Sequence, residues 1–154
     1  MLIPDLTIMN VLMGAFAGMM AGLLMGLVSE GCYELMIFKS SLLRVDGSFL
    51  IRTLRMKESK ILTYGMGLPV HVITSGVFGA VYILVAGQFK LNVFSVATIA
   101  LYFFILWLAM LFSALPIAGQ GIMGKRAGRS TWLEQLILHI VYGIGYFVAL
   151  KLIL

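Results

Sequence analysis

Four long apolar runs, separated by shorter polar stretches, occupy most of the 154 residues. The runs cover about residues 8–28, 61–86, 91–115 and 132–154. Because the core of a bilayer holds no water, an apolar segment of about 20 residues satisfies its own backbone hydrogen bonds as a helix. The pattern therefore predicts an all-α, integral membrane four-helix bundle that forms one domain.

Two features refine these spans. Pro69 lies inside the second run, and since proline lacks an N–H donor, a helix that begins near Pro69 is an equally good interpretation. Only Gly87–Lys90 separates the second run from the third. A connection this short predicts that these two helices form an antiparallel hairpin.

Composition and charge agree with a membrane protein, because 62% of the residues are hydrophobic and only 11% are charged. Most basic residues lie between the first and second runs or between the third and fourth: Lys39, Arg44, Arg52, Arg55, Lys57, Lys60, Lys125, Arg126 and Arg129. Loops rich in Lys and Arg stay in the cytoplasm. We therefore expect a multi-pass protein of the cytoplasmic membrane with both termini outside (N-out and C-out) and a basic cytoplasmic loop at 30–60.

The basic loops predict contact with anionic lipid headgroups. Arg52, Arg55 and Lys57 alternate with apolar residues, which favours a short amphipathic helix on the membrane surface, with an irregular loop as the alternative. Lys125 and Arg126 are expected to face headgroups in the same way. The lipid bilayer is thus the expected partner, and nucleic acid is not.

Gly119, Gly124 and Lys125 match most of a phosphate-binding loop, but Arg126 stands where that motif requires Ser or Thr. A loop of this kind also follows a β-strand, whereas this one follows an apolar helix. We therefore expect no nucleotide as a ligand, and interpret these glycines as turn residues.

Small residues repeat along the first run, where Gly14, Gly18, Gly22 and Gly26 recur every four residues. Glycines at this spacing line one helical face and allow a second helix to approach closely. The partner is left open by the sequence. It is another helix of this bundle, a second copy in a homo-oligomer, or another subunit of a membrane complex.

The candidate cofactor site is the only pair of histidines, His71 in the second run and His139 in the fourth. Both lie one to two turns from the predicted cytoplasmic end, so their depths match. Two imidazoles on parallel helices are the axial ligands of a bis-histidine haem. Gly76, Gly79 and Gly143 follow the histidines and would leave space for a flat macrocycle. Haem b is therefore the candidate cofactor.

Other interpretations of the same residues stay open. Each imidazole could hydrogen-bond a nearby carbonyl, a hydroxyl or Glu134, and these groups could relay protons or, with Glu134, bind zinc. Asn10 and Ser75 could line a polar route with the histidines in a small transporter or channel. Copper at Met9 and Met13 is a minor alternative, because thioethers without Cys or His make an incomplete site.

No nucleophile–base pair or carboxylate dyad appears in the spans, so we do not expect an enzyme. The preferred hypothesis is a non-catalytic accessory or structural subunit of a larger membrane complex, of a respiratory or redox kind, that holds haem b between two helices. The small transporter or channel is the alternative.

Three short motifs carry a family resemblance: HVITSGVFGAVY from His71, LPIAGQGIMG from Leu115 and HIVYGIGY from His139. They resemble the YagU-like and related small four-helix membrane proteins of bacteria and archaea. The resemblance covers about Pro69 to Phe147. It implies the fold and the placement of the two histidines, and it brings no activity and no catalytic residue.

Overall fold

The computed structural model describes residues 7–154, and every regular element in this part of the chain is a helix. Four helical segments are long and apolar enough to cross a membrane: α1 (Ile8–Glu34), α3 (Lys60–Gln88), the segment Val96–Ile117 and α6 (Thr131–Ile153). The predicted fold class is confirmed at this level. Such a chain contacts the lipid bilayer through its apolar helices.

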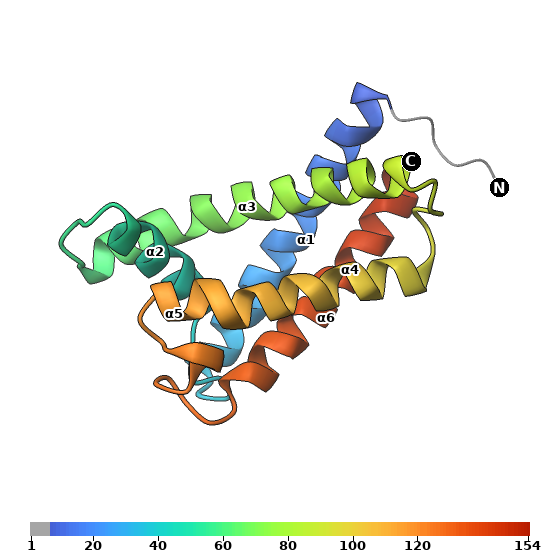
Figure 1. Ribbon diagram of the computed structural model, residues 1–154. Coiled ribbons are helices and arrows are strands. Elements are labelled where there is room, and N and C mark those ends of the chain that lie inside the picture. Colours follow the sequence, from blue (N-terminus) through green and yellow to red (C-terminus); the bar gives the residue numbers. More distant parts are fainter. Residues whose placement is uncertain (1–6) are drawn as a thin grey trace.

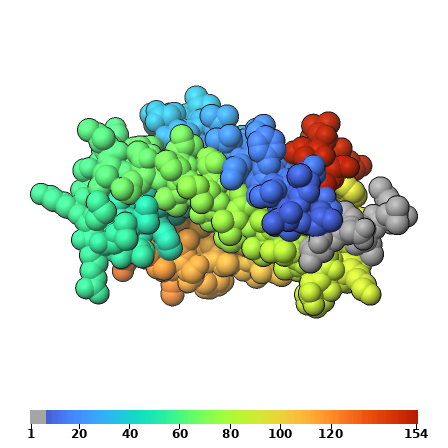
Figure 2. Space-filling model, turned by 90° about the horizontal axis from the view of Figure 1, so that it is seen from above, coloured from blue at the N-terminus to red at the C-terminus, as the bar shows by residue number. Residues whose placement is uncertain are grey.

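The four long segments form an elongated bundle (Figure 1). α1 packs along α3 and α6, and α4 (Val96–Ala109) packs on α6. The start of α1, the end of α6 and the α3–α4 connection lie at one end of the molecule. α2 (Leu42–Thr53) and the connection that leads into α6 lie at the opposite end, and Figure 2 shows the same separation from above.

Hydroxyl side chains cap the N-termini of four helices. In each case the side-chain oxygen accepts a hydrogen bond from the backbone N–H three residues later: Thr7 for α1, Ser41 for α2, Ser59 for α3 and Ser95 for α4. These caps satisfy donors that have no partner within the helix. The cap at Ser95 explains why the third span begins at Val96, five residues later than the apolar pattern predicts.

The glycine face of α1 lies against α3. A Cβ at Gly14 or Gly18 would overlap the backbone of α3 near Gly79, and one at Gly22 would overlap the side chain of Ser75. Gly26 lies beside the ring of His71. The small residues of α1 are therefore used inside the bundle, where they bring α1 and α3 into direct backbone contact.

The basic segment at 30–60 contains α2, which is placed differently from the amphipathic helix predicted there. α2 begins at Leu42 and ends at Thr53, so Arg55 and Lys57 lie beyond it. It packs on α3 through reciprocal glycine contacts, because a Cβ at Gly47 or Gly67 would overlap the backbone of the opposite helix. α2 thus belongs to the core of this end of the bundle.

The third span is not a regular α-helix throughout. It changes to a π-helical turn at Met110–Ala114 before the short helix α5 (Leu115–Ile117). Pro116 supplies no N–H for the carbonyl four residues earlier, which removes one α-helical bond at this point. The chain then turns at Gly119, Gly121 and Gly124, all with positive φ, and a 3₁₀ turn (Ile122–Gly124) leads toward α6.

Candidate functional site

His71 is held by hydrogen bonds at both ring nitrogens. Its Nδ1 lies 2.7 Å from Oδ2 of Asp46, a residue of α2, and its Nε2 lies 3.0 Å from the carbonyl oxygen of Gly22 in α1. The His71 side chain is 7% exposed and the Asp46 side chain 18%. A titratable pair from α2 and α3 therefore lies against α1, with His71 buried and Asp46 partly buried.

The partners of His71 decide where its protons lie. The Gly22 carbonyl only accepts, so Nε2 must carry a hydrogen. The remaining proton lies between Nδ1 and Asp46, giving either an imidazolium with a carboxylate or a neutral imidazole with a carboxylic acid. Both arrangements are neutral overall. This neutrality allows the pair to lie among apolar helices, where an isolated charge is costly.

His139 is oriented by its own helix. Its Nδ1 lies 2.8 Å from the carbonyl oxygen of Gln135, one turn earlier in α6. This carbonyl requires a hydrogen on Nδ1 when the ring is neutral, which leaves Nε2 as an acceptor. No hydrogen bond from residues 7–154 reaches Nε2. The ring thus presents an unused acceptor.

The two histidines line one cavity of about 230 Å³. Its polar lining comes from Asp46, His71, Thr74, Ser75, Ser113, His139 and Tyr142, and its apolar walls include Phe49, Phe78, Leu106 and Met110. The π-helical turn supplies part of one wall, in keeping with the frequent occurrence of such turns at functional sites. Sequence reasoning paired the histidines, and the structure places both on this cavity.

The cavity is bounded by α3 on one side and by α4 with its π-helical turn on the other. α3 and α4 contact each other beside it, where the Tyr102 hydroxyl donates to the Phe78 carbonyl over 2.8 Å and the Tyr82 and Tyr102 rings lie edge to face. Thr74 and Phe78 of the cavity wall are exposed on the bundle surface. The cavity therefore opens sideways, between two candidate spans.

An aromatic cluster closes the bundle beyond the cavity. The hydroxyls of Tyr142 and Tyr146 donate to the carbonyls of Ser75 and Gly79, over 2.6 and 2.7 Å. The rings of Tyr142 and Tyr146 also pack edge to face against Phe103. Each hydroxyl donates its hydrogen to a backbone carbonyl of α3 and so joins α6 to α3. Neither hydrogen remains available to extend the polar lining of the cavity through the cluster.

The glycines expected to make room for haem face other partners. A Cβ at Gly76 would meet Met19, one at Gly79 would overlap α1, and one at Gly143 would lie 3.1 Å from the ring of Phe103. None of the three opens a slot between the histidines. For His71 to ligate haem through Nε2, this atom would also have to give up its hydrogen bond to the Gly22 carbonyl of α1, the helix against which it packs.

The other candidate ligands lie apart from this site. The Glu134 carboxylate accepts from the Lys39 backbone N–H at 2.9 Å and from the Ser130 hydroxyl at 2.7 Å. Met9, near the start of α1, is 56% exposed. Within residues 7–154, no group of three His, Cys, Asp or Glu side chains could hold a metal ion.

The basic residues of the α2 end have mixed surroundings. Arg52 pairs with Glu58 at 3.2 Å and its guanidinium lies against Gly119. A hydrogen bond from Ser48 to Glu58, assisted by Arg52, lowers the pKa of the Glu58 carboxyl. The remaining four predicted headgroup ligands are exposed: Arg55, Lys57, Lys125 and Arg126.

Asp46 is the residue of this candidate site that the sequence analysis did not single out. A signal for it exists, because Leu42, Val45, Asp46 and Phe49 share one helical face by their spacing, and a single acid within an apolar face needs a partner. The residue lies outside the four apolar runs, in the 30–60 segment whose clearest sequence feature is its basic charge.

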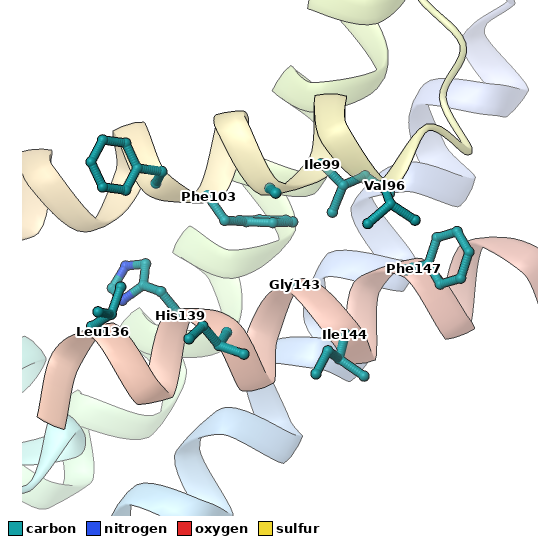
Figure 3. A pocket seen from close by; sticks show the side chains of 11 residues that line it. Val96, Ile99, Phe103, Leu136, His139, Gly143, Ile144 and Phe147 are labelled. Atoms are coloured by element: carbon teal, nitrogen blue, oxygen red, sulfur yellow. The ribbon is translucent and has the colours of Figure 1, made fainter. Parts of the chain in front are cut away.

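A second depression, the α4–α6 groove, is lined by residues of α4 and α6. It measures about 300 Å³ and is lined almost entirely by apolar side chains. Figure 3 shows His139 and Leu136 at one end of the groove and Val96 and Phe147 at the other. His139 is the one residue that lines both the cavity and the groove.

Fold and site together define a helical protein with four candidate membrane spans and a largely apolar cavity that carries a few polar side chains. No protein-family model matches this chain, and neither does a curated protein or a solved structure. The resemblance to the YagU-like proteins therefore stays a prediction. Function has to be argued from the site itself.

Proposed function

We propose that this protein is a non-catalytic, membrane-embedded binding protein, whose cavity receives the polar group of a lipid-soluble ligand. The observation that carries the proposal is the Asp46–His71 pair on a cavity that opens between two candidate spans. Ionisable residues inside a membrane are costly and mark functional sites. A sideways opening admits molecules dissolved in the bilayer.

The chemistry of the cavity supports binding over catalysis and conduction. Nε2 of His71 faces the Gly22 carbonyl and not a hydroxyl, so the pair lacks the activated nucleophile of a Ser–His–Asp site. A transporter or channel receives less support, because the tyrosine hydroxyls of the aromatic cluster are bonded to backbone carbonyls. The accessory-subunit hypothesis is compatible with a binding protein of this kind.

The distribution of charge supports the proposed orientation. All Lys and Arg residues except Lys90 and Lys151 lie in segments at the α2 end of the bundle. By the positive-inside rule, this end faces the cytoplasm in our proposal and both termini lie outside. The Asp46–His71 pair then lies near the cytoplasmic side of the membrane.

The free acceptors on the cavity define the probe for a test. Oδ2 of Asp46 bonds to His71, and no residue of the described chain donates to its other oxygen, Oδ1. A suitable probe is 4-nonylphenol, which carries one hydroxyl donor on an alkyl chain. Its matched control is 4-nonylanisole, in which a methyl ether removes the donor. Binding to the purified protein in nanodiscs can be measured by native mass spectrometry.

We expect 4-nonylphenol to bind about tenfold more tightly than 4-nonylanisole, since one hydrogen bond contributes about 1.5 kcal/mol and about 1.4 kcal/mol is a factor of ten in affinity. Ser113→Leu should block the cavity, whereas Phe112→Leu, on the exposed neighbouring position, should leave binding unchanged. Asp46→Leu, which removes both carboxyl oxygens, should weaken the phenol alone. The proposal is contradicted if the two probes bind with equal affinity, or if the Ser113→Leu and Phe112→Leu variants bind 4-nonylphenol with equal affinity.

A further inference from the structure

The cavity offers two separate hydrogen-bond acceptors. One is Oδ1 of Asp46, and the other is Nε2 of His139, which accepts because Nδ1 donates to the Gln135 carbonyl. Both residues line the same cavity, so a ligand that satisfies both acceptors needs two donors. A ligand with one hydroxyl leaves one acceptor without a partner, which costs binding free energy.

The walls of the cavity suit a flat ring. Phe49 and Phe78 line it from α2 and α3, and Tyr142 lines it from α6. Aromatic side chains favour edge-to-face or offset-stacked contact with another ring. An aromatic head that carries two hydroxyl groups therefore meets both the acceptors and the apolar walls.

The α4–α6 groove supplies a place for an apolar tail. It starts at His139, where it adjoins the cavity, and runs past Phe103 and Gly143 to Phe147. The groove lies between two candidate membrane spans and is lined by apolar atoms, so an alkyl or prenyl chain is the occupant that fits its surroundings. The absence of a side chain at Gly143 keeps the groove open next to the Phe103 ring.

We infer that the ligand is a quinol with an alkyl or prenyl tail: one hydroxyl donates to Asp46, the other donates to Nε2 of His139, and the tail lies in the α4–α6 groove. This inference rests on the proposed function, because it names the ligand class of the same cavity. It concerns binding of the reduced, hydroxyl-bearing form and includes no electron transfer.

The test compares 2-nonylhydroquinone with 3-nonylphenol, which carries the same tail at the same position relative to one hydroxyl and lacks the second hydroxyl. We expect the wild-type protein to bind the hydroquinone about tenfold more tightly, the effect of one additional hydrogen bond. His139→Phe should abolish this preference, so that the two probes bind this variant with the same affinity. His139→Gln should retain the preference, because the amide oxygen accepts, and this variant guards against misfolding as the cause.

The tail is tested separately with Gly143→Leu, which should weaken 2-nonylhydroquinone about tenfold and leave hydroquinone without a tail unaffected. The exposed neighbour Ile144 gives the matched control Ile144→Leu, which should change neither affinity. If 4-nonylphenol binds as proposed but the second hydroxyl, His139 and Gly143 have no effect, the quinol inference is overturned and the binding function stands. If none of the probes binds, both are overturned.

Discussion

Gly79→Ala is the substitution whose cost follows most directly from the packing of α1 on α3. An added Cβ at Gly79 would lie 2.9 Å from Cα of Gly18 and 3.0 Å from Cε2 of Tyr146, and it would overlap the carbonyl of Gly14. Two of these three obstacles are backbone atoms, which cannot rotate away as a flexible side chain could. α1 and α3 must therefore separate.

A matched control is available on the same helix. Gly65 has no atom within 4 Å of an added Cβ, so Gly65→Ala adds a methyl group to open space. Replacing Gly by Ala inside a helix stabilises by about 1 kcal/mol, and this contribution is common to both variants. The difference between them is the cost of overpacking, about 1–3 kcal/mol, so Gly79→Ala should be less stable than Gly65→Ala by this amount.

The free energy of unfolding can be measured by SDS titration in mixed micelles, with far-UV circular dichroism as the readout. In order of stability, Gly65→Ala should come first, with wild type below it and Gly79→Ala equal to wild type or lower. Equal midpoints for the two variants would refute the reasoning, because they would mean that α1 does not approach α3 as closely as the structure shows.

Three further outcomes follow from individual contacts. Tyr146→Phe removes a buried hydroxyl that donates to a carbonyl of α3, and should lower the free energy of unfolding in the same titration by about 0.5–1.5 kcal/mol. Gly67→Ala should separate α2 from α3, which hydrogen exchange would show as faster exchange of the α2 amides. The lowered pKa of Glu58 means that its bond to Ser48 stabilises the fold above the ordinary pKa of glutamate. That stabilisation is lost as pH falls through the lowered value, so Ser48→Ala should raise the Glu58 pKa in a carboxyl NMR titration.

The membrane spans could be predicted because a long apolar run has one stable form in a bilayer. The glycine repeat of α1 also identified a packing face, because small residues let another helix approach closely. It did not specify α3 as the partner, since any neighbouring helix can use such a face. The π-helical turn near Pro116 was missed as well. Apolar residues on either side of it give no sign of a change in helical period.

For the histidine site, the sequence pattern predicted the positions of the two side chains but not their hydrogen bonds. Equal depth in two spans predicted that His71 and His139 share a space, and both line the same cavity. Their hydrogen bonds could not be predicted, because they depend on a backbone carbonyl of α1 and on the close approach of α2. Gly76 and Gly143 likewise proved to face packed side chains, since glycine spacing alone does not say which neighbour approaches.

The position of Asp46 on α2, and not on a span, has a consequence for how the cavity works. A carboxylate within a spanning run would have to enter the bilayer with its helix, whereas Asp46 reaches the bundle on a short helix that is held by glycine contacts at Gly47 and Gly67. A shift of α2 would remove the partner of His71 and part of the cavity wall together. The affinity of the cavity and the docking of α2 are therefore coupled, and each must change when the other is perturbed.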